Sequence, residues 1–478
     1  MPMLPNFCAP SGQAPSVAAS AERTINLLLE PLSGKQDQYV LYGAPGLRPV
    51  DVLPSAPVRG LYTTSTGRVF AFTSTGLFEL FSGWSHLSRG TIPTGTQPIS
   101  AADNGLHMVF SVEGQGRLYD LTTDALTALP TTGPATWGHF GYLDGYLLVN
   151  EPGTRRFWYS ELLNAASWPG TYVYSAESRP DLVTSLLVDH RQVILFGTQS
   201  IEVWNSTGQA PPPTSVQGPF ARMESVAIEQ GSEAEWSPAA LDLTFLWLAG
   251  SPRGQGPVYG MRGYEPERVS TYALEEAMRL MPTVGDAQAW TLRQGGHAFY
   301  GLDLPSGKQT WILDRILGAW TQLVSLQEDG SLSNYPCNVT TTAFGQHLWG
   351  SRDSGALYIW DTSYYLYGDR PIYRERTTPH LRKEQDRVRY AKFGLLAEAG
   401  VGLDGGAIPG SEPQVLLSYS DDGGHTWSYP RTRSLGKIGQ GAQQVTWHQL
   451  GQSRQRAFRI IITDPVRVAL LGATVEVS

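Results

Sequence analysis

Short apolar stretches separated by turn residues recur along the first three quarters of the chain. The clearest example is residues 296–323, GHAFYGLDLPSGKQTWILDRILGAWTQL, in which three apolar runs are separated by Pro-Ser-Gly and Asp-Arg turns. Val, Ile, Tyr, Phe, Trp and Thr fit a pleated, half-buried surface, whereas Gly, Pro, Asp and Ser stand where a chain reverses. The pattern predicts three consecutive antiparallel strands, a β-meander.

Paired strand-like runs of this kind occur seven times. They are 69–72 with 77–80, 107–111 with 117–121, 146–150 with 156–160, 192–196 with 200–204, 243–248 with 257–261, 297–302 with 308–313, and 347–350 with 356–360. Successive pairs lie about 40–50 residues apart, a period of about four strands that is typical of a β-propeller. We predict an all-β fold with a propeller of seven blades, or six if one copy is an embellishment. Trp311 and Trp320 are then expected to pack between neighbouring sheets.

Three segments depart from this pattern. Residues 271–281, TYALEEAMRLM, have apolar positions at helical spacing and end at Pro282, which predicts a short helix between blades. The Pro-rich stretch 209–219 predicts a loop. The first twenty residues, rich in Pro and Ala, predict an extended arm or a disordered tail, and the strand-like runs that follow, 25–29 and 39–42, can pair with another element.

A polar, charged stretch at residues 377–386 indicates a domain boundary. Beyond it, five segments alternate as strands and predict a β-sandwich: 389–398, 414–420, 443–450, 457–463 and 466–477. We therefore divide the chain into an N-terminal arm with leading strands (1–57), a β-propeller (58–376) and a C-terminal β-sandwich (377–478).

Composition agrees with a turn-rich β protein, because the 478 residues include 52 Gly and 33 Pro. Only 16% of residues are charged, which fits either a surface largely buried in an assembly or a surface rich in Ser and Thr. The net charge of −8 is uneven: residues 370–478 hold 15 basic and 10 acidic residues, and the preceding 369 hold 20 basic and 33 acidic. An acidic body argues against general nucleic-acid binding and can instead repel DNA that slides past it.

The cysteines and the N-terminus bear on where the protein is made. Cys8 and Cys337 lie far apart, which predicts neither a disulfide framework nor a metal site and favours synthesis in a reducing cytoplasm. The first residues lack the basic start and apolar core of a signal peptide. No apolar run approaches the roughly 20 residues that span a bilayer. We expect a chain that is neither exported by that route nor membrane-spanning.

One local motif has a known physical role. The sequence SDDGGHTW matches the Asp-box pattern at Ser420, Asp422, Gly424, Thr426 and Trp427. The Asp carboxylate accepts main-chain N–H bonds across a tight turn, the glycines permit positive φ, and the Trp is expected to bury beneath the hairpin. Asp-boxes are frequent in glycosidase propellers, which raises a carbohydrate-binding or hydrolysing alternative. The motif occurs once and in the terminal domain, so we favour a structural role.

Candidate chemistry is otherwise sparse. A glycosidase needs two carboxylates about 5–10 Å apart, and no pair is set apart by the sequence. The nine His show no metal-ligand spacing, and neither a Walker loop nor a Gly-x-Ser-x-Gly elbow occurs. We predict a non-enzymatic protein without cofactor or metal. Arg454 and Arg456 can contact a partner or DNA phosphates, or pair with Asp464, and we favour a structural role for them.

Four phrases, in the same order along residues 22–478, resemble one family. They are TINLLLEPLSGKQDQYVLYGAPGL, GTQSIEVWNSTG, GHAFYGLDLPSGKQTWILD, and a closing run that contains RVRYAKFGLLAEAGVG, VLLSYSDDGGHTW and WHQLGQSRQRAFRIIITDPVRVALLGATVEV. The family is that of the tail nozzle, or tail hub, proteins of short-tailed phages, also called packaged DNA stabilisation proteins. The Pro- and Ala-rich start and residues 209–219 depart from the family pattern.

The resemblance implies a non-enzymatic protein of the virion tail, made in the cytoplasm of the host bacterium. In this family six copies form a ring below the portal and its adaptor, and the ring continues the DNA channel. Together with a tail needle or plug, the ring retains the packaged double-stranded DNA until ejection, and tailspike or fibre proteins are further partners. Two alternatives remain open at this point: a carbohydrate-binding or hydrolysing propeller such as a sialidase-like tail adhesin, and a soluble scaffold propeller with peptide-binding faces.

Overall fold

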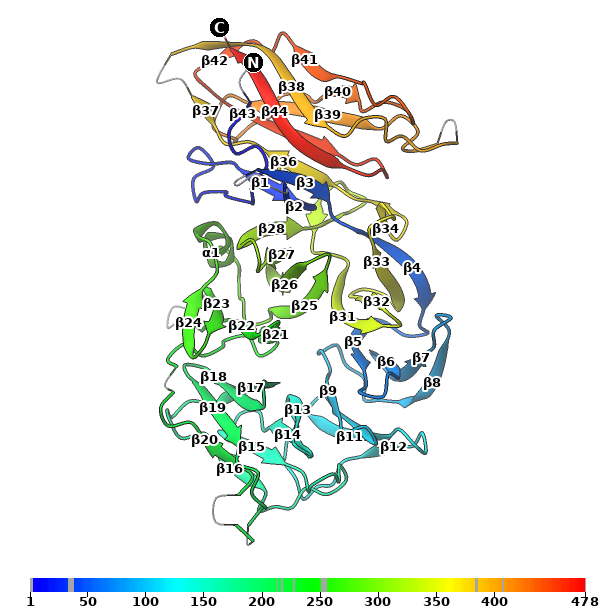
Figure 1. The fold of residues 1–478 in the computed structure, drawn as a ribbon, viewed down its shortest axis with the longest axis vertical. Helices are drawn as coiled ribbons and strands as arrows, with labels where there is room; N and C mark the ends of the chain where they lie inside the picture. Colours follow the sequence, from blue (N-terminus) through cyan, green and yellow to red (C-terminus); the bar gives the residue numbers. More distant parts are fainter. Residues whose placement is uncertain are drawn as a thin grey trace.

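The computed structural model describes residues 3–32, 38–212, 214–215, 218–226, 228–250, 256–382, 386–405 and 408–477. A ring of β-sheets occupies one end of the molecule and a pair of packed sheets occupies the other (Figure 1). The predicted all-β fold, a propeller followed by a sandwich, is confirmed. The predicted helix between blades is α1 (Tyr272–Arg279), which Thr271 caps by accepting the main-chain N–H of Leu274.

Seven blades of four strands form the ring in the described part of the chain; five are separate sheets, and the sixth and seventh are parts of larger sheets. The first four are β5–β8 (Val58–Thr63, Val69–Thr73, Gly76–Leu80, His86–Thr91), β9–β12 (Ser100–Asp103, His107–Val112, Gln115–Asp120, Leu126–Ala128), β13–β16 (Phe140–Leu143, Tyr146–Asn150, Arg156–Tyr159, Val173–Ser175) and β17–β20 (Val183–Asp189, Gln192–Gly197, Ile201–Ser206, Phe220–Arg222). The next two are β21–β24 (Ala239–Leu241, Thr244–Leu248, Val258–Arg262, Glu265–Arg268) and β25–β28 (Gln288–Gln294, His297–Leu304, Gln309–Asp314, Ala319–Leu323). Each predicted strand pair forms the two middle strands of a blade.

The seventh blade joins the two ends of the ring. It contains β31 (Cys337–Ala343), β32 (Gln346–Ser351) and β33 (Ala356–Asp361), and its outer strand is β4 (Gly46–Val52), which pairs antiparallel with β33. Two short strands, β34 (Leu366–Tyr367) and β35 (Arg370–Pro371), extend this sheet, and the two-stranded β29–β30 (Ser325–Leu326, Leu332–Ser333) precedes it. A strand from the leading segment thus closes the propeller.

Blades pack face to face, and this explains their continuous apolar strands. Trp311 and Trp320 of the sixth blade lie in one buried cluster with Leu246 and Leu248 of the fifth. The Trp320 indole also donates a hydrogen bond of 2.7 Å to the Val269 carbonyl oxygen. The expectation that these indoles pack between neighbouring sheets is confirmed.

Two sheets form the sandwich. One contains β2 (Leu27–Pro31), β3 (Tyr39–Gly43), β44 (Ala469–Val477), β38 (Val388–Ala397) and β41 (Val445–His448), with β42 (Gln452–Ser453) at its side. The other contains β1 (Arg23–Ile25), β36 (Arg374–Thr377), β43 (Gln455–Ile462), β39 (Gln414–Ser420) and β40 (Arg431–Ser434), with β37 (Leu381–Arg382) paired to β43. The apolar core between them includes Phe393, Trp447 and Phe458.

The second of these sheets is continuous with the propeller. Strand β1 pairs parallel with β28 of the sixth blade and antiparallel with β36 of the sandwich. Hydrogen-bonded strands therefore run without a break from β25 to β40, and β1 lies at the point where the two bodies meet (Figure 1). A shared sheet couples the two bodies more rigidly than a linker would.

Residues 3–22 lie against this junction as a packed segment. Leu4 and Phe7 belong to the apolar core of the sandwich. The Leu4 N–H donates to the Ala473 carbonyl oxygen at 2.8 Å, and the Ser11 N–H donates to that of Trp320 at 3.0 Å. Of the two forms predicted for this stretch, the described residues adopt the arm, because its apolar side chains have a core to enter.

Candidate functional site at the junction of propeller and sandwich

Three arginines lie buried in the sandwich part of the sheet that continues into the propeller. Arg374 and Arg376 are on β36 and Arg456 is on β43, and each residue is at most 1% exposed. A guanidinium stays charged in proteins, so burying one destabilises the fold unless hydrogen bonds and a counter-charge compensate. The hydrogen-bond acceptors and carboxylates around each arginine therefore show which segments stabilise its buried charge.

The N-terminal arm supplies the partners of Arg376. Its guanidinium donates to the carbonyl oxygens of Phe7 at 2.5 Å and Asn6 at 2.8 Å, and to the Thr24 hydroxyl at 2.8 Å. Glu22 provides the counter-charge. Burial lowers the pKa of Arg376, and Glu22 opposes that shift. The arm and β36 therefore depend on each other.

Arg456 is held by one carboxylate and two rings. Its guanidinium donates to both Asp421 carboxylate oxygens, at 2.6 and 2.7 Å, and to the Leu450 carbonyl oxygen. The rings of Tyr419 and Tyr390 lie 4.0 and 4.4 Å from its guanidinium carbon, within cation–π range. The ion-pair partner considered from sequence was Asp464, and the structure places Asp421 there instead.

Arg454 differs from Arg456 in its surroundings. It precedes β43 and is exposed, whereas Arg456 is enclosed by its partners. Only Arg454 therefore presents its side chain to solvent.

Replacing Asp421 with Ala should leave the Arg456 guanidinium buried without its counter-charge. We expect the free energy of unfolding to fall by about 2 kcal/mol, because the Leu450 carbonyl and the two rings remain and Asp421 is partly exposed. Urea unfolding measures the effect. Asp404, an exposed carboxylate of the same domain, serves as control: an Asp404→Ala variant that loses as much stability would contradict the assignment.

The Asp-box residues form one tight turn after β39. The Asp422 carboxylate accepts the Thr426 N–H at 2.9 Å and the Thr426 hydroxyl at 2.5 Å, and the Ser420 hydroxyl donates to it at 2.7 Å. These bonds hold the pKa of Asp422 well below its usual range. Gly424 has a φ of 94°, a conformation that glycine adopts without strain. Trp427 is half-buried, and the Arg459 guanidinium carbon lies 4.3 Å from its ring centroid.

The same turn touches the N-terminal arm. A Cβ at Gly423 would come within 2.8 Å of the Ala18 Cα, and one at Gly424 would come within 2.8 Å of the Ala21 Cβ. Nearby, His380 Nε2 lies 2.8 Å from the Val17 carbonyl oxygen. The close approach of the arm requires glycine at both positions, so the motif here holds a chain segment.

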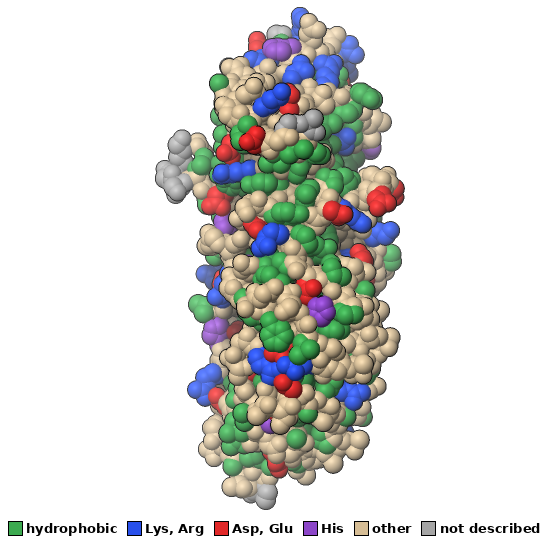
Figure 2. Space-filling view, turned by 90° about the vertical axis from the view of Figure 1, so that its right-hand side faces the viewer, with side chains coloured by type: hydrophobic (Ala, Val, Ile, Leu, Met, Phe, Trp, Pro, Cys, Tyr) green, Lys and Arg blue, Asp and Glu red, His purple; other side chains and the backbone are tan. Residues whose placement is uncertain are grey.

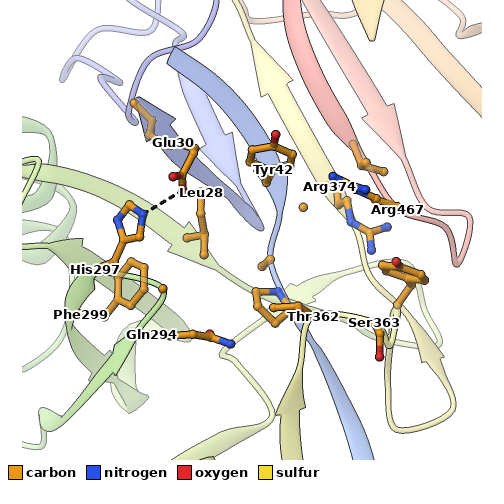
Figure 3. Close-up of a pocket in the computed structure, with 17 residues that line it drawn as sticks. Leu28, Glu30, Tyr42, Gln294, His297, Phe299, Thr362, Ser363, Arg374 and Arg467 are labelled. Atoms are coloured by element: carbon orange, nitrogen blue, oxygen red, sulfur yellow. Dashed lines mark hydrogen bonds and ion pairs between the residues drawn. The ribbon is translucent and has the colours of Figure 1, made fainter. Parts of the chain in front are cut away.

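A pocket of about 430 Å³ opens between β2–β3, the sixth blade, the segment 362–365 that follows β33, and residues 467–468 just before β44 (Figure 3). One end carries Arg374 and Arg467, and the other carries His297 and Glu30. Apolar and aromatic side chains lie between the two ends; they include Leu28, Tyr42, Phe299 and Tyr365. The pocket is therefore basic at one end and apolar in the middle.

His297 connects β2 of the sandwich to the propeller at the other end of the pocket. Its Nε2 is 2.9 Å from a Glu30 carboxylate oxygen and its Nδ1 is 2.5 Å from one of Asp314 (Figure 3 shows the Glu30 contact). Burial acts to lower the pKa of His297, but the hydrogen bonds and charges of Asp314 and Glu30 outweigh it and raise the pKa above its ordinary value. Both ring nitrogens donate when the imidazole is protonated.

Stability should consequently depend on pH through His297. Because the folded pKa is raised, the contribution is fully present below the unfolded pKa of about 6.5 and is lost as pH rises through the folded pKa. We expect the difference in unfolding free energy between wild type and His297→Gln to shrink from about pH 6 to about pH 9. Chemical denaturation across this range measures it. A difference that is constant with pH would show that the ring acts by packing alone.

Asn26 ties three segments together and was missed from sequence. Its side-chain amide donates to the carbonyl oxygens of Val324 at 2.9 Å and Tyr373 at 2.8 Å. Its side-chain oxygen accepts the Val324 N–H at 3.0 Å and the Tyr367 hydroxyl at 3.1 Å. Asn26 is fully buried and has a φ of 49°, a conformation enriched in Asn. Its place as the one polar residue inside the strand-like run 25–29 was the available signal.

The charges on the outer surface are mixed in sign. Figure 2 shows the right-hand side of Figure 1, where acidic and basic side chains stand close together among apolar ones. Arg68 and Arg89, for example, both pair with Glu79 and Asp124. The described residues contain no group of three or more His, Cys, Asp or Glu side chains placed to hold a metal ion. None of their helices has the length and apolar character needed to cross a membrane.

Comparisons with known proteins agree with this architecture. Residues 20–365 match the family model described as bacteriophage P22 Gp10, beta-propeller, and residues 373–478 match bacteriophage P22 Gp10, beta-sandwich. A search of curated proteins finds no match.

The matching solved structures include the following three, each with a TM-score below 0.5. The computationally designed Ika8 protein has 11% identity and a TM-score of 0.38, covering 71% of this chain and 99% of its own. The N-terminal domain of Nup159 has 11% identity and a TM-score of 0.40, and the match covers 70% of this chain and 98% of the Nup159 chain. The WD40 beta propeller domain of Doa1 has 12% identity and a TM-score of 0.39, covering 66% and 96%.

The propeller and the sandwich share a sheet, and both match, in the same order, the two models of one phage family. The protein is therefore a structural protein of the phage tail. The chain belongs to the bacteriophage P22 Gp10 family, the family of tail nozzle or packaged DNA stabilisation proteins. The resemblance seen in the sequence is confirmed, and the family places the protein in the virion. These matches do not favour the carbohydrate alternative.

Proposed function

We propose that this chain is the subunit of a tail nozzle. Six copies form a ring below the portal and its adaptor, continue the DNA channel, and help to retain the packaged genome until ejection. The observation that carries the proposal is the match of both the propeller and the sandwich, in order, to one phage tail family. The proposed role is structural and involves no catalysis.

The charge distribution supports an orientation of the subunit. Residues 1–369 include 33 acidic and 20 basic residues, whereas residues 370–478 include 10 acidic and 15 basic residues. A negative wall repels the DNA phosphates and lets DNA slide, whereas a basic wall would bind it. Acidic surfaces of the propeller or its loops therefore face the channel, and the arm and the sandwich bind neighbouring subunits or the adaptor.

The sheet shared by propeller and sandwich supports a rigid wall. Strands run hydrogen-bonded from β25 to β40 through β1, so load on one body is transmitted to the other. Exposed Arg454, in the sandwich, is a partner contact in this arrangement, and Arg456 fixes the strand that follows it. The adaptor, a tail needle or plug, and tailspike or fibre proteins are the other partners, and the chain is made in the host cytoplasm before assembly.

Electron microscopy of the assembled tail tests this function. The expected result is a ring of six copies coaxial with the portal, with a predominantly acidic lumen. A strongly basic lumen, or this chain lying outside the channel, would overturn the proposal. Size measurement with and without the adaptor protein separates a ring subunit from a scaffold propeller that stays monomeric, and a turnover assay with sialosides tests for hydrolysis.

A further inference from the structure

The three buried arginines of β36 and β43 differ in whether a carboxylate pairs with them. Arg376 has Glu22 as counter-charge and Arg456 has Asp421. Arg374 is equally buried, but among the described residues its guanidinium forms no ion pair with a carboxylate. One Nη donates to the Asp464 carbonyl oxygen at 3.2 Å, and Nε is buried without a hydrogen-bond partner. Arg374 thus carries a buried charge without an ion-pair partner among the described residues.

Arg374 is also the one of these three that lines the pocket of about 430 Å³. Burial lowers its pKa to about 10, and the nearby Tyr367, Tyr365 and Asp464 oppose that shift. An isolated buried charge is destabilising, and replacing it with an apolar residue is often neutral or stabilising. A side chain that the fold alone does not need is a candidate for binding.

The rest of the pocket defines the ligand. Arg467 lies beside Arg374 (Figure 3), and its side chain is 56% exposed; among the residues that the structure describes, its ion-pair partner is Glu398, at 3.3 Å. An exposed pair of this kind is weak, so the guanidinium can turn to a ligand. Guanidinium groups match the planar carboxylate with two parallel hydrogen bonds. Leu28 and Phe299 offer an apolar wall to the stem that carries it.

We propose that this pocket binds a carboxylate on an apolar stem, with the anion between Arg374 and Arg467. Glu30 at the opposite end disfavours a second negative charge at the far end of the ligand, which argues for a single anionic group on an apolar stem. The carboxylate belongs either to a free organic acid or to an acidic side chain of a polypeptide. The site does not depend on assembly of a ring.

Thermal unfolding of the full-length chain tests the site. The probes are sodium 3-phenylpropionate and a capped Phe-Glu dipeptide, each compared with sodium chloride at equal ionic strength. A ligand that binds only the folded state raises the unfolding midpoint. We expect both probes to raise it in wild type, the whole shift to be lost in Arg374→Met, and at least half to be lost in Arg467→Met. Arg370→Met, which removes an exposed charge elsewhere, keeps the full shift.

The stability of Arg374→Met in chloride alone adds a second criterion. We expect its midpoint to equal or exceed that of wild type, because the buried charge is gone. A larger shift with the dipeptide assigns the site to a protein segment, and a larger shift with the free acid assigns it to a small molecule. No shift in wild type, or an unchanged shift in Arg374→Met, would overturn the site. If Arg374→Met does not fold, Arg374→Lys and Arg467→Met are measured in its place. An unfolding midpoint that the probes raise as much in both variants as in wild type would also overturn the site.

Discussion

A chain that lacks residues 1–22 is expected to lose about 5 kcal/mol of unfolding free energy. The deletion removes the carbonyl acceptors of Asn6 and Phe7 and the Glu22 carboxylate from a guanidinium that is wholly buried. It also takes Leu4 and Phe7 out of the sandwich core. Urea unfolding followed by tryptophan fluorescence measures the loss.

The electrostatic part of this loss can be separated from the apolar part. In the truncated chain, Arg376→Met should restore about 2 kcal/mol, because no unpaired cation is then buried. In the full-length chain the same substitution should destabilise, since it breaks a satisfied network. The control is the double variant Leu4→Ala and Phe7→Ala, which keeps the main-chain acceptors and which Arg376→Met should not rescue. If Arg376→Met destabilises the truncated chain as well, the arm acts through apolar contacts only.

The propeller was predictable from sequence because its information is local. Most pairs of middle strands are joined by a turn of a few residues, so apolar runs and turn residues appear together within one short window. The period of about 40–50 residues then identified the ring. Helix α1 was predicted for the same reason, since its cap and its apolar spacing lie within one stretch.

The junction was not predictable because its pairings join distant parts of the chain. Strand β1 pairs with β28 and β36, and β4 pairs with β33, and no pattern in these short strands specifies such partners. Arg456 shows the same limit. Asp464 is near in sequence, but the partner is Asp421, 35 residues away and brought close by the pairing of β39 with β43. The Asp-box, in contrast, forms its hydrogen bonds within one turn, as its motif indicates. The expected burial of Trp427 is not met, because its ring stays half-buried beside the Arg459 guanidinium.

The N-terminal segment shows why composition alone does not predict whether a segment is ordered. Its first twenty residues have few large apolar side chains, which is typical of an extended or disordered chain. Leu4 and Phe7 nevertheless enter a core built largely from residues more than 380 positions later, and Arg376 binds the main-chain carbonyls of Asn6 and Phe7. The arm is held by Arg376, which lies outside it and binds its main-chain carbonyls. Because any residue type supplies a main-chain carbonyl, the sequence of the arm gives no sign of this interaction.

Replacing Asn26 with Ala is expected to reduce the free energy of unfolding by about 4 kcal/mol. The substitution removes four side-chain hydrogen bonds and leaves the buried groups of Val324, Tyr373 and Tyr367 with unmet donors or acceptors. These groups lie 298 to 347 residues away in sequence, so the loss should loosen the propeller and the sandwich together. Urea unfolding with fluorescence for the whole chain and hydrogen exchange at β1 measure both effects.

Two further variants separate the hydrogen bonds from the backbone conformation. Asn26→Gly accepts the φ of 49° without strain but makes none of the side-chain bonds, so it should lose nearly as much stability as Asn26→Ala. Asn164→Ala, at an exposed position in a propeller loop, should lose less than about 1 kcal/mol. A Gly variant close to wild type would mean that Asn26 is required for its backbone conformation alone. Equal losses in Asn26→Ala and Asn26→Gly would instead establish its amide as the hydrogen-bonded link among β1, the sixth blade and the segment that leads into β36.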